Sequence, residues 1–298
     1  DHEKAELVLD EIMRQRPETP DALNLLGMTR HAQGRTEEGI VFVERAIALN
    51  ETAAYRASLG RLLMAAGHTE AGFAALGRAL ELEPGQPEVL RAIGAARIRA
   101  GDMAGAEAAY REGTAAAPQD AELLFGHAYT LAESGATQAA IEQYRLLLTV
   151  DPRHVQAHTN LAALLLAAGD YDGAVRHFHE ATEVGPESAY ALYNLGRALD
   201  ARGDFALALD CYDRALAIQP DLAAAHNNAG TALQRQGQQA EALERFDRAL
   251  AINPDYPVAR FNRSVSLLSL GRFTEGWAEY EWRFRVEGLA GRIGARSF

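Results

Sequence analysis

The chain has 298 residues, a net charge of −12 and 48% hydrophobic residues. A surface this acidic repels phosphate backbones, which disfavours nucleic acid as a partner. No apolar stretch approaches the ~20 residues that span a bilayer and no secretory signal is visible, so we expect a cytoplasmic protein without membrane insertion. The single cysteine, Cys211, rules out an internal disulfide, and its apolar helical surroundings predict a small core residue.

Glycine and proline recur with one constant period. Seven glycines follow one another at intervals of 34 residues from Gly67 to Gly271, and Gly34 precedes them by 33. Six prolines from Pro84 to Pro254 keep the same interval. Such a period indicates one supersecondary unit copied along the chain. The chain is rich in alanine and leucine, which predicts that the unit is helical.

The chain opens with an incomplete copy of this unit. Residues 1–19 place Leu9 and Ile12 on one helical face and end the pattern at Pro17. This matches only the second half of the unit, so we expect a partial repeat that contributes a second helix alone, as in a truncated array.

Residues 20–286 are expected to hold about eight tandem copies, and the copy that starts at Ala189 shows the pattern clearly. With Ala189 as place 1, the residues at places 4, 7, 8 and 11 share one face of a helix that ends at Gly203. A second helix ends before Pro220, because the residue preceding a proline is pushed out of helical space. Small residues at places 8, 20 and 27 let the two helices approach, and Tyr212 at place 24 fills the space between them.

This pattern resembles the tetratricopeptide repeat family. The matching small residues at place 8 are Gly27, Gly60, Gly94, Ala128, Ala162, Gly196, Gly230 and Ser264. The residues at place 24 are Val43, Leu76, Tyr110, Tyr144, Phe178, Tyr212, Phe246 and Tyr280, so the first two copies depart from the family's aromatic residue. The resemblance implies an all-α, right-handed superhelical solenoid of helix-turn-helix repeats. It further implies a non-catalytic scaffold that binds an extended peptide or partner protein in its concave groove.

The eighth copy carries both tryptophans, Trp277 and Trp282. One interpretation is a terminal repeat that seals the stack with bulky residues, and the other is a junction with a following domain. The segment 276–283 resembles the last repeat of bacterial arrays that precede a glycosyltransferase-like domain. It suggests, as an alternative function, the substrate-recognition arm of a larger glycosyltransferase. We expect residues 287–298 to be a linker or tail.

The face of each first helix opposite the packed one, at places 2, 5, 6, 9 and 13, lines the groove in the family that the chain resembles. Place 6 is asparagine in the last four copies, although asparagine is a mediocre helix former. A carboxamide both donates and accepts hydrogen bonds, so a ladder of them could hold the backbone of an extended chain. Similar ladders occur in the arrays of O-linked N-acetylglucosamine transferases. The alternative is a solvated consensus residue. The ladder comprises Asn160, Asn194, Asn228 and Asn262.

Aromatic, asparagine and arginine side chains surround the predicted ladder, and residues of these types supply much of the binding energy at interfaces. The alternative is that some of the aromatic residues pack against neighbouring helices. These additional candidates are Tyr190, Tyr193, Arg197, Asn227, Arg235 and Phe261. The first four copies have no asparagine at place 6 and carry other residues on this face, so we expect the two halves to bind differently. Those residues include Arg61, Arg91, Arg99, Phe125 and Tyr129.

The sequence offers little support for metal binding or catalysis. His154 and His158 are four residues apart, and His177 and His179 two apart, but no third ligand accompanies either pair. Neither a nucleophile with its base nor a glycine-rich phosphate loop is apparent. We therefore expect no metal, no cofactor and no enzymatic activity. A third possible role, self-association into a structural scaffold, leaves the oligomeric state open.

Overall fold

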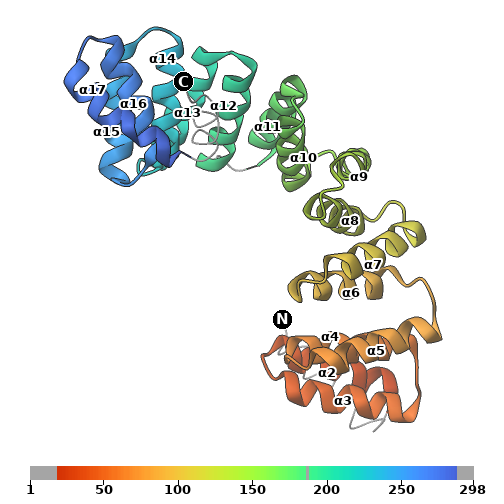
Figure 1. The fold of residues 1–298 in the computed structure, drawn as a ribbon. Helices are drawn as coiled ribbons and strands as arrows, with labels where there is room; N and C mark the ends of the chain where they lie inside the picture. The colour runs from red at the N-terminus through yellow and green to blue at the C-terminus, as the bar shows by residue number, and fades with distance from the viewer. Residues whose placement is uncertain (1–18, 186–187, 287–298) are drawn as a thin grey trace. The chain divides into compact units, whose positions relative to one another are not determined.

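The computed structural model describes residues 19–185 and 188–286, and the chain divides into two compact units, Asp1–Val150 and Asp151–Phe298. Every regular element in these described ranges is a helix (Figure 1), which confirms the all-α solenoid of helical hairpins. The helix expected within residues 1–19 and the tail expected at 287–298 lie outside the described residues, apart from Thr19.

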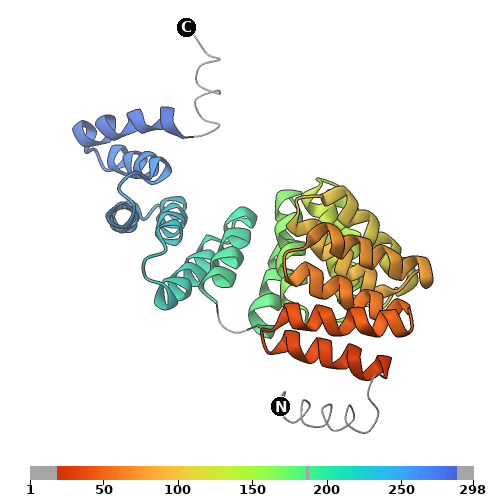
Figure 2. The same cartoon turned by 90° about the horizontal axis from the view of Figure 1, so that it is seen from below.

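Each unit is a series of helix pairs. The first unit contains α2 (Pro20–Ala32), α3 (Thr36–Leu49), α4 (Ala53–Ala65), α5 (Thr69–Leu82), α6 (Pro87–Arg99), α7 (Met103–Ala116), α8 (Ala121–Glu133) and α9 (Thr137–Val150). The second contains α10 (Val155–Ala167), α11 (Tyr171–Val184), α12 (Ala189–Arg202), α13 (Phe205–Ile218), α14 (Ala223–Arg235), α15 (Gln239–Ile252), α16 (Pro257–Ser269), α17 (Phe273–Tyr280) and the 3₁₀ helix η1 (Glu281–Arg285). Figure 2 shows both series from below.

The helices end where the periodic glycines and prolines predict. All eight glycines of the series have φ between 77° and 101°, the left-handed conformation that terminates a helix. Gly203 follows α12 directly, and its N–H donates to the carbonyl of Leu199 at 3.0 Å. The second helix of this pair, α13, ends two residues before Pro220.

Small and aromatic residues interlock inside each hairpin, as the sequence predicts. Tyr212 of α13 is 1% exposed, and a Cβ added to Gly196 of α12 would lie 2.6 Å from its Cε1 atom. Gly230 and Phe246 repeat this arrangement in the next pair, at 2.7 Å. Cys211 is buried beside Tyr212, which confirms its predicted place in the core.

The first helices of successive pairs form one layer. In the second unit α12 contacts α14, and α14 contacts α16. No comparable contact joins α13, α15 and α17 to one another within the described part of that unit. The closer spacing of the first helices makes theirs the inner layer of the stack, and this is the layer that carries the predicted site.

A polar contact between neighbouring pairs was not predicted. Place 4, on the packed face of the first helix, holds a side chain that donates to the carbonyl of the preceding turn's proline in three pairs. His158 Nε2 lies 3.0 Å from the oxygen of Pro152, and His226 Nε2 lies 3.0 Å from that of Pro220. In the last pair, Arg260 donates to the carbonyl of Pro254 through Nε and Nη2.

Candidate functional site

A hydrogen-bonded network joins three first helices in the second unit. Asn228 Nδ2 of α14 donates to the hydroxyl of Tyr193 on α12 at 3.2 Å. Asn262 Nδ2 of α16 donates to Asn227 Oδ1 at 3.1 Å and to Thr231 Oγ1 at 3.3 Å. Asn227 Nδ2 donates to Asn228 Oδ1 at 3.0 Å, which connects these contacts into one network. We call these five residues the Asn–Tyr network.

The network has a regular geometry across the repeats. The asparagine at place 6 of one pair reaches the residue at place 5 of the preceding pair, 35 residues earlier, in both Asn228–Tyr193 and Asn262–Asn227. This contact ties neighbouring first helices together, so two of the four ladder asparagines have a structural partner. Asn227, predicted to line the groove, is only 3% exposed. It is hydrogen-bonded to both Asn228 and Asn262 and so connects the two ladder residues.

Unused hydrogen-bonding capacity remains on two of the ladder residues, Asn194 and Asn262. Asn194, on α12, is half-buried and its carboxamide has no hydrogen-bond partner among residues 19–185 and 188–286. Asn262 uses both N–H groups, whereas its Oδ1 accepts no hydrogen bond from any described residue. Asn160 lies on α10, one pair before Asn194, and is also half-buried.

The predicted aromatic residues divide between exposed and packed positions. Tyr190 is 59% exposed at the start of α12. Tyr193 contacts the buried Tyr212, with ring centroids 6.0 Å apart, and Phe261 contacts Tyr280 at 5.6 Å. Tyr193 and Phe261 therefore contribute to packing, and Tyr190 remains the open aromatic candidate.

The predicted arginines give this face a local positive charge. Arg197 is exposed and lies over the ring of Tyr193 at 5.9 Å, and Arg235 is exposed and lies over Phe205 at 5.3 Å. Burial raises the pKa of Asp200 on α12, and the nearby Arg235 guanidinium opposes this effect. The Asp200 Oδ1 atom is buried without a hydrogen-bond partner in the described chain. A ligand with anionic and hydrogen-bonding groups would therefore meet the guanidinium groups of Arg197 and Arg235 together with the carboxamides of the ladder.

Sequence reasoning missed the polar residues that extend this row. Gln234 Nε2 donates at 2.7 Å to both the backbone oxygen of Asn262 and the Oγ of Ser266. Thr231 occupies place 9, one of the predicted groove positions, so periodicity alone could have identified it. Gln234 and Ser266 occupy places 12 and 10, and no signal in the repeat pattern marks them.

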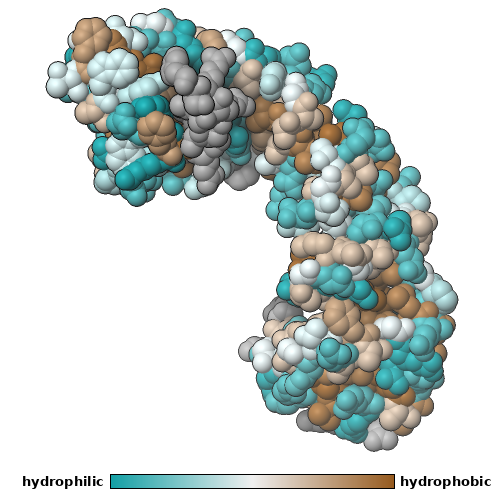
Figure 3. All heavy atoms as spheres, in the orientation of Figure 1, coloured by the Kyte–Doolittle hydropathy of each residue, from teal (hydrophilic) through white to brown (hydrophobic). Residues whose placement is uncertain are grey.

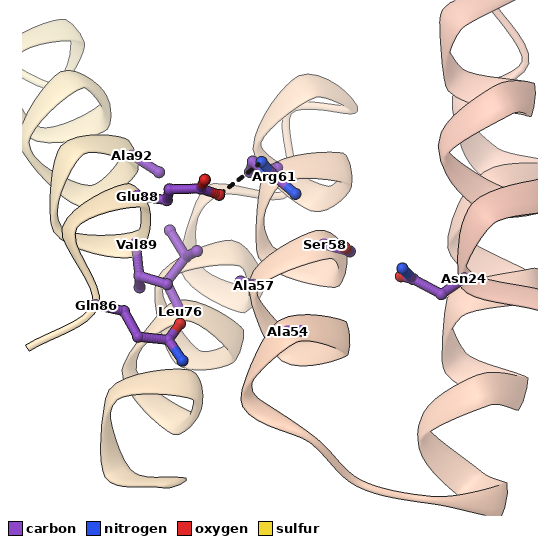
Figure 4. A pocket seen from close by; sticks show the side chains of 10 residues that line it. All are labelled: Asn24, Ala54, Ala57, Ser58, Arg61, Leu76, Gln86, Glu88, Val89 and Ala92. Atoms are coloured by element: carbon purple, nitrogen blue, oxygen red, sulfur yellow. Dashed lines mark ion pairs between the residues drawn. The ribbon is translucent and has the colours of Figure 1, made fainter. Parts of the chain in front are cut away.

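The inner layer of the first unit has a separate pocket of about 270 Å³, lined by residues of α2, α4, α5 and α6 and of the turn before α6. Figure 4 shows Asn24 pointing toward Ser58, and Arg61 paired with Glu88. The Arg61–Glu88 distance is 4.0 Å, and Ser58 is 3% exposed. Asn24 Oδ1 is buried and accepts no hydrogen bond from the described residues. This pocket offers acceptors and one ion pair in place of a row of amides.

The described residues show neither a metal-binding cluster nor a membrane-spanning helix. The described residues contain no group of three or more histidine, cysteine, aspartate or glutamate side chains placed to hold a metal ion. None of the described helices combines the length and apolarity needed to cross a bilayer.

The last helices leave large aromatic side chains exposed. Phe273 and Trp277 of α17 are 60% and 58% exposed, and Phe284 of η1 is 48% exposed. Trp282 instead packs against Arg260, whose guanidinium lies 4.6 Å from the ring centroid. On the face seen in Figure 3, hydrophilic and hydrophobic residues are interspersed over both units.

Comparison with protein families gives matches to models described as tetratricopeptide repeat. They cover residues 20–52, 63–124, 125–174, 159–223 and 223–256. No curated protein sequence matches the chain.

Solved structures match over much of the chain. A crystal structure of MamA is 25% identical, with 56% of this chain and 92% of that chain covered and a TM-score of 0.54. YrrB, a TPR protein with an unusual peptide-binding site, is 20% identical over 63% of this chain and 98% of its own, with a TM-score of 0.52. PilF of Pseudomonas aeruginosa is 18% identical over 74% and 97%, with a TM-score of 0.58. The last two likenesses concern the fold alone.

Proposed function

Because the chain belongs to the tetratricopeptide repeat family, we propose that it is a non-catalytic scaffold that binds an extended segment of a partner protein. The segment lies along the inner helices α12, α14 and α16. The main support is Asn194, a half-buried carboxamide on this layer without a hydrogen-bond partner among the described residues. Helix positions of this kind ordinarily hold residues with better helix propensity.

The surrounding groups suit a peptide backbone with acidic or aromatic side chains. Asn194 can donate to a carbonyl and accept from an N–H of one peptide unit. Asn262 Oδ1 can accept a second N–H, while the Asn–Tyr network holds its amide in place. Arg197 and Arg235 supply positive charge, and Tyr190 supplies an exposed ring. YrrB is described as having a peptide-binding site, but at 20% identity this proposal rests on the residues of the present chain.

Substitution of the asparagines tests the proposal. Peptides of 15 residues selected from a random library on the unaltered protein would serve as probes. The Asn194→Ala/Asn228→Ala double variant should bind them about tenfold more weakly, because each lost hydrogen bond contributes roughly 0.5–1.5 kcal/mol. Fluorescence anisotropy measures the affinity.

Two further variants make the result specific. Asn194→Ala alone should weaken binding without disturbing the Asn–Tyr network, since Asn194 is not one of its members. Asn50→Ala/Asn253→Ala removes two exposed carboxamides that follow α3 and α15, and it should leave affinity unchanged. Equal affinities for the unaltered protein and the Asn194/Asn228 double variant would exclude the ladder as the recognition element.

A second candidate function is the substrate-recognition arm of a larger glycosyltransferase. The exposed Phe273 and Trp277 on α17 favour it, because aromatic residues left open at the last helix pair suit contact with another domain. The gene sequence downstream of codon 298 tests this candidate. A nucleotide-sugar-binding α/β domain there would support it, and a stop codon would remove it.

A further inference from the structure

A pocket of about 440 Å³ opens in the second unit between α13, the first turn of α14 and α15. Its lining combines the apolar Leu216 and Ile252 with His226, Arg245 and Arg248. His226 and Asn228 are two residues apart on α14 and therefore point about 200° apart around the helix. The pocket thus lies on the side of α14 opposite the Asn–Tyr network.

His226 presents a buried hydrogen-bond acceptor in this pocket. Its side chain is 5% exposed, and its Nε2 lies 3.0 Å from the carbonyl oxygen of Pro220. A carbonyl can only accept, so Nε2 carries the proton and the neutral ring has its lone pair on Nδ1. That Nδ1 atom is buried and has no hydrogen-bond partner in the described residues.

Burial, assisted by two nearby guanidinium groups, keeps the His226 ring neutral. Burial is the main cause of the lowered pKa of His226. Arg245 and Arg248 on α15 act in the same direction, whereas the Pro220 carbonyl and Asp213 on α13 oppose it. At neutral pH the Nδ1 atom is therefore an acceptor.

The same chain contains a version of this site in which the acceptor is satisfied. His158 stands 68 residues before His226 and makes the same 3.0 Å contact with the preceding proline, Pro152. Its Nδ1 lies 3.0 Å from Nδ1 of His177. The residue 68 positions after His177 is Arg245, which pairs instead with Asp213 at 2.8 Å. With arginine in place of histidine at this position, the buried His226 Nδ1 atom lacks the partner that His177 gives to His158.

A cation completes the site. Arg248 is exposed and forms no ion pair with any described residue, whereas Arg245 is neutralised by Asp213. Inorganic phosphate would suit Arg248, and at neutral pH it keeps a proton that it could donate to His226 Nδ1. It would gain nothing, however, from the apolar Leu216 and Ile252. The lining instead suits a ligand with three parts: an acid group, an adjacent donor and an apolar group.

We propose that this pocket binds a small amphipathic carboxylic acid with an N–H or O–H donor beside the carboxylate, such as an N-acylated amino acid or an α-hydroxy acid. The donor meets His226 Nδ1, the carboxylate pairs with Arg248, and the apolar group contacts Leu216 and Ile252. This site is independent of the peptide site proposed above, so either can fail without the other.

Titration of the full 298-residue chain with N-acetyl-L-leucine tests the site. Isothermal calorimetry should show saturable binding, and the His226 Nδ1 resonance should shift in long-range ¹H–¹⁵N spectra. N-acetyl-L-leucinamide lacks the carboxylate and 4-methylpentanoate lacks the N–H, so each should bind about tenfold more weakly. A peptide with a carboxy-terminal leucine should bind as well as N-acetyl-L-leucine if the natural ligand is the carboxyl terminus of a protein. Weaker binding of the peptide than of N-acetyl-L-leucine would identify a free small acid as the ligand.

Matched variants separate the two key groups. His226→Leu should reduce affinity about tenfold, and leucine is structurally acceptable because Leu192 fills the same place in the preceding pair at 1% exposure. His158→Leu removes the equivalent ring and should leave affinity unchanged. Arg248→Gln should weaken binding about tenfold, with Arg176→Gln on α11 as its control.

Three outcomes would overturn the proposal. They are absence of saturation at millimolar concentrations, equal binding of all three compounds, and unchanged affinity in His226→Leu. If circular dichroism shows that this variant does not fold, the three compounds and the His226 resonance of the unaltered chain decide the question.

Discussion

The effect of a single glycine on stability depends on its backbone conformation in this fold. Gly203 has φ of 101°, where a residue with a Cβ is strained. We predict that Gly203→Ala lowers the free energy of unfolding by about 1 kcal/mol. Gly77 lies within α5 with nothing inside 4 Å of an added Cβ. Gly77→Ala should therefore raise stability by up to about 1 kcal/mol, and urea unfolding followed by circular dichroism should give opposite signs for the two variants.

Two buried histidines should make stability depend on pH. Burial lowers the pKa of both His127 and His226, so both are neutral in the folded protein at pH 7. The unfolded chain takes up these protons below its ordinary value of about 6.5, and stability should be lost as pH falls through that range. Each histidine contributes at most about 1.4 kcal/mol per pH unit. Urea midpoints between pH 7.5 and 5.5 should fall less in His226→Leu than in the unaltered chain, and equal slopes would contradict this account.

At the scale of the helix, capping differs between otherwise similar pairs. Asp170 caps α11 by accepting from the N–H of Gly173 at 2.9 Å, whereas Asp204 before α13 makes no side-chain cap. Asp170→Ala should therefore cost about 1 kcal/mol, and Asp204→Ala should cost less than about 0.5 kcal/mol, since it loses only an exposed ion pair with Arg202. Thermal unfolding would measure both, and similar losses would show that the cap is unimportant.

Helix ends were predictable from sequence because they depend on local backbone chemistry. Gly203 and Pro220 mark the ends of α12 and α13 through conformations that only these residues favour or enforce. The partners of the ladder asparagines were not predictable. Whether Asn228 meets solvent or Tyr193 depends on the offset between neighbouring first helices, which a 34-residue period does not specify. Likewise, the period places His226 on the packed face of its helix, but its hydrogen bond to Pro220 depends on the path of the preceding turn.

For the molecule as a whole, the division into two units locates the predicted site. The Asn–Tyr network, Asn194 and both arginines lie within the unit Asp151–Phe298. We predict that this unit, produced alone, remains helical and binds the selected peptides within about twofold of the full chain, because neighbouring repeats supply most of its stability. Circular dichroism and anisotropy measure the two properties. A tenfold loss of affinity would mean that the first unit contributes directly.

Contacts between near neighbours also determine how the protein would respond to load. The substantial contacts of each described helix are with helices one or two steps away along the chain, so no described segment distant in sequence locks the series. A tension applied to the two ends would therefore peel hairpins off in succession at modest force, with no single rupture event. Each released hairpin would add a fixed increment of length. It could refold when the tension falls, while the remaining hairpins stay folded throughout.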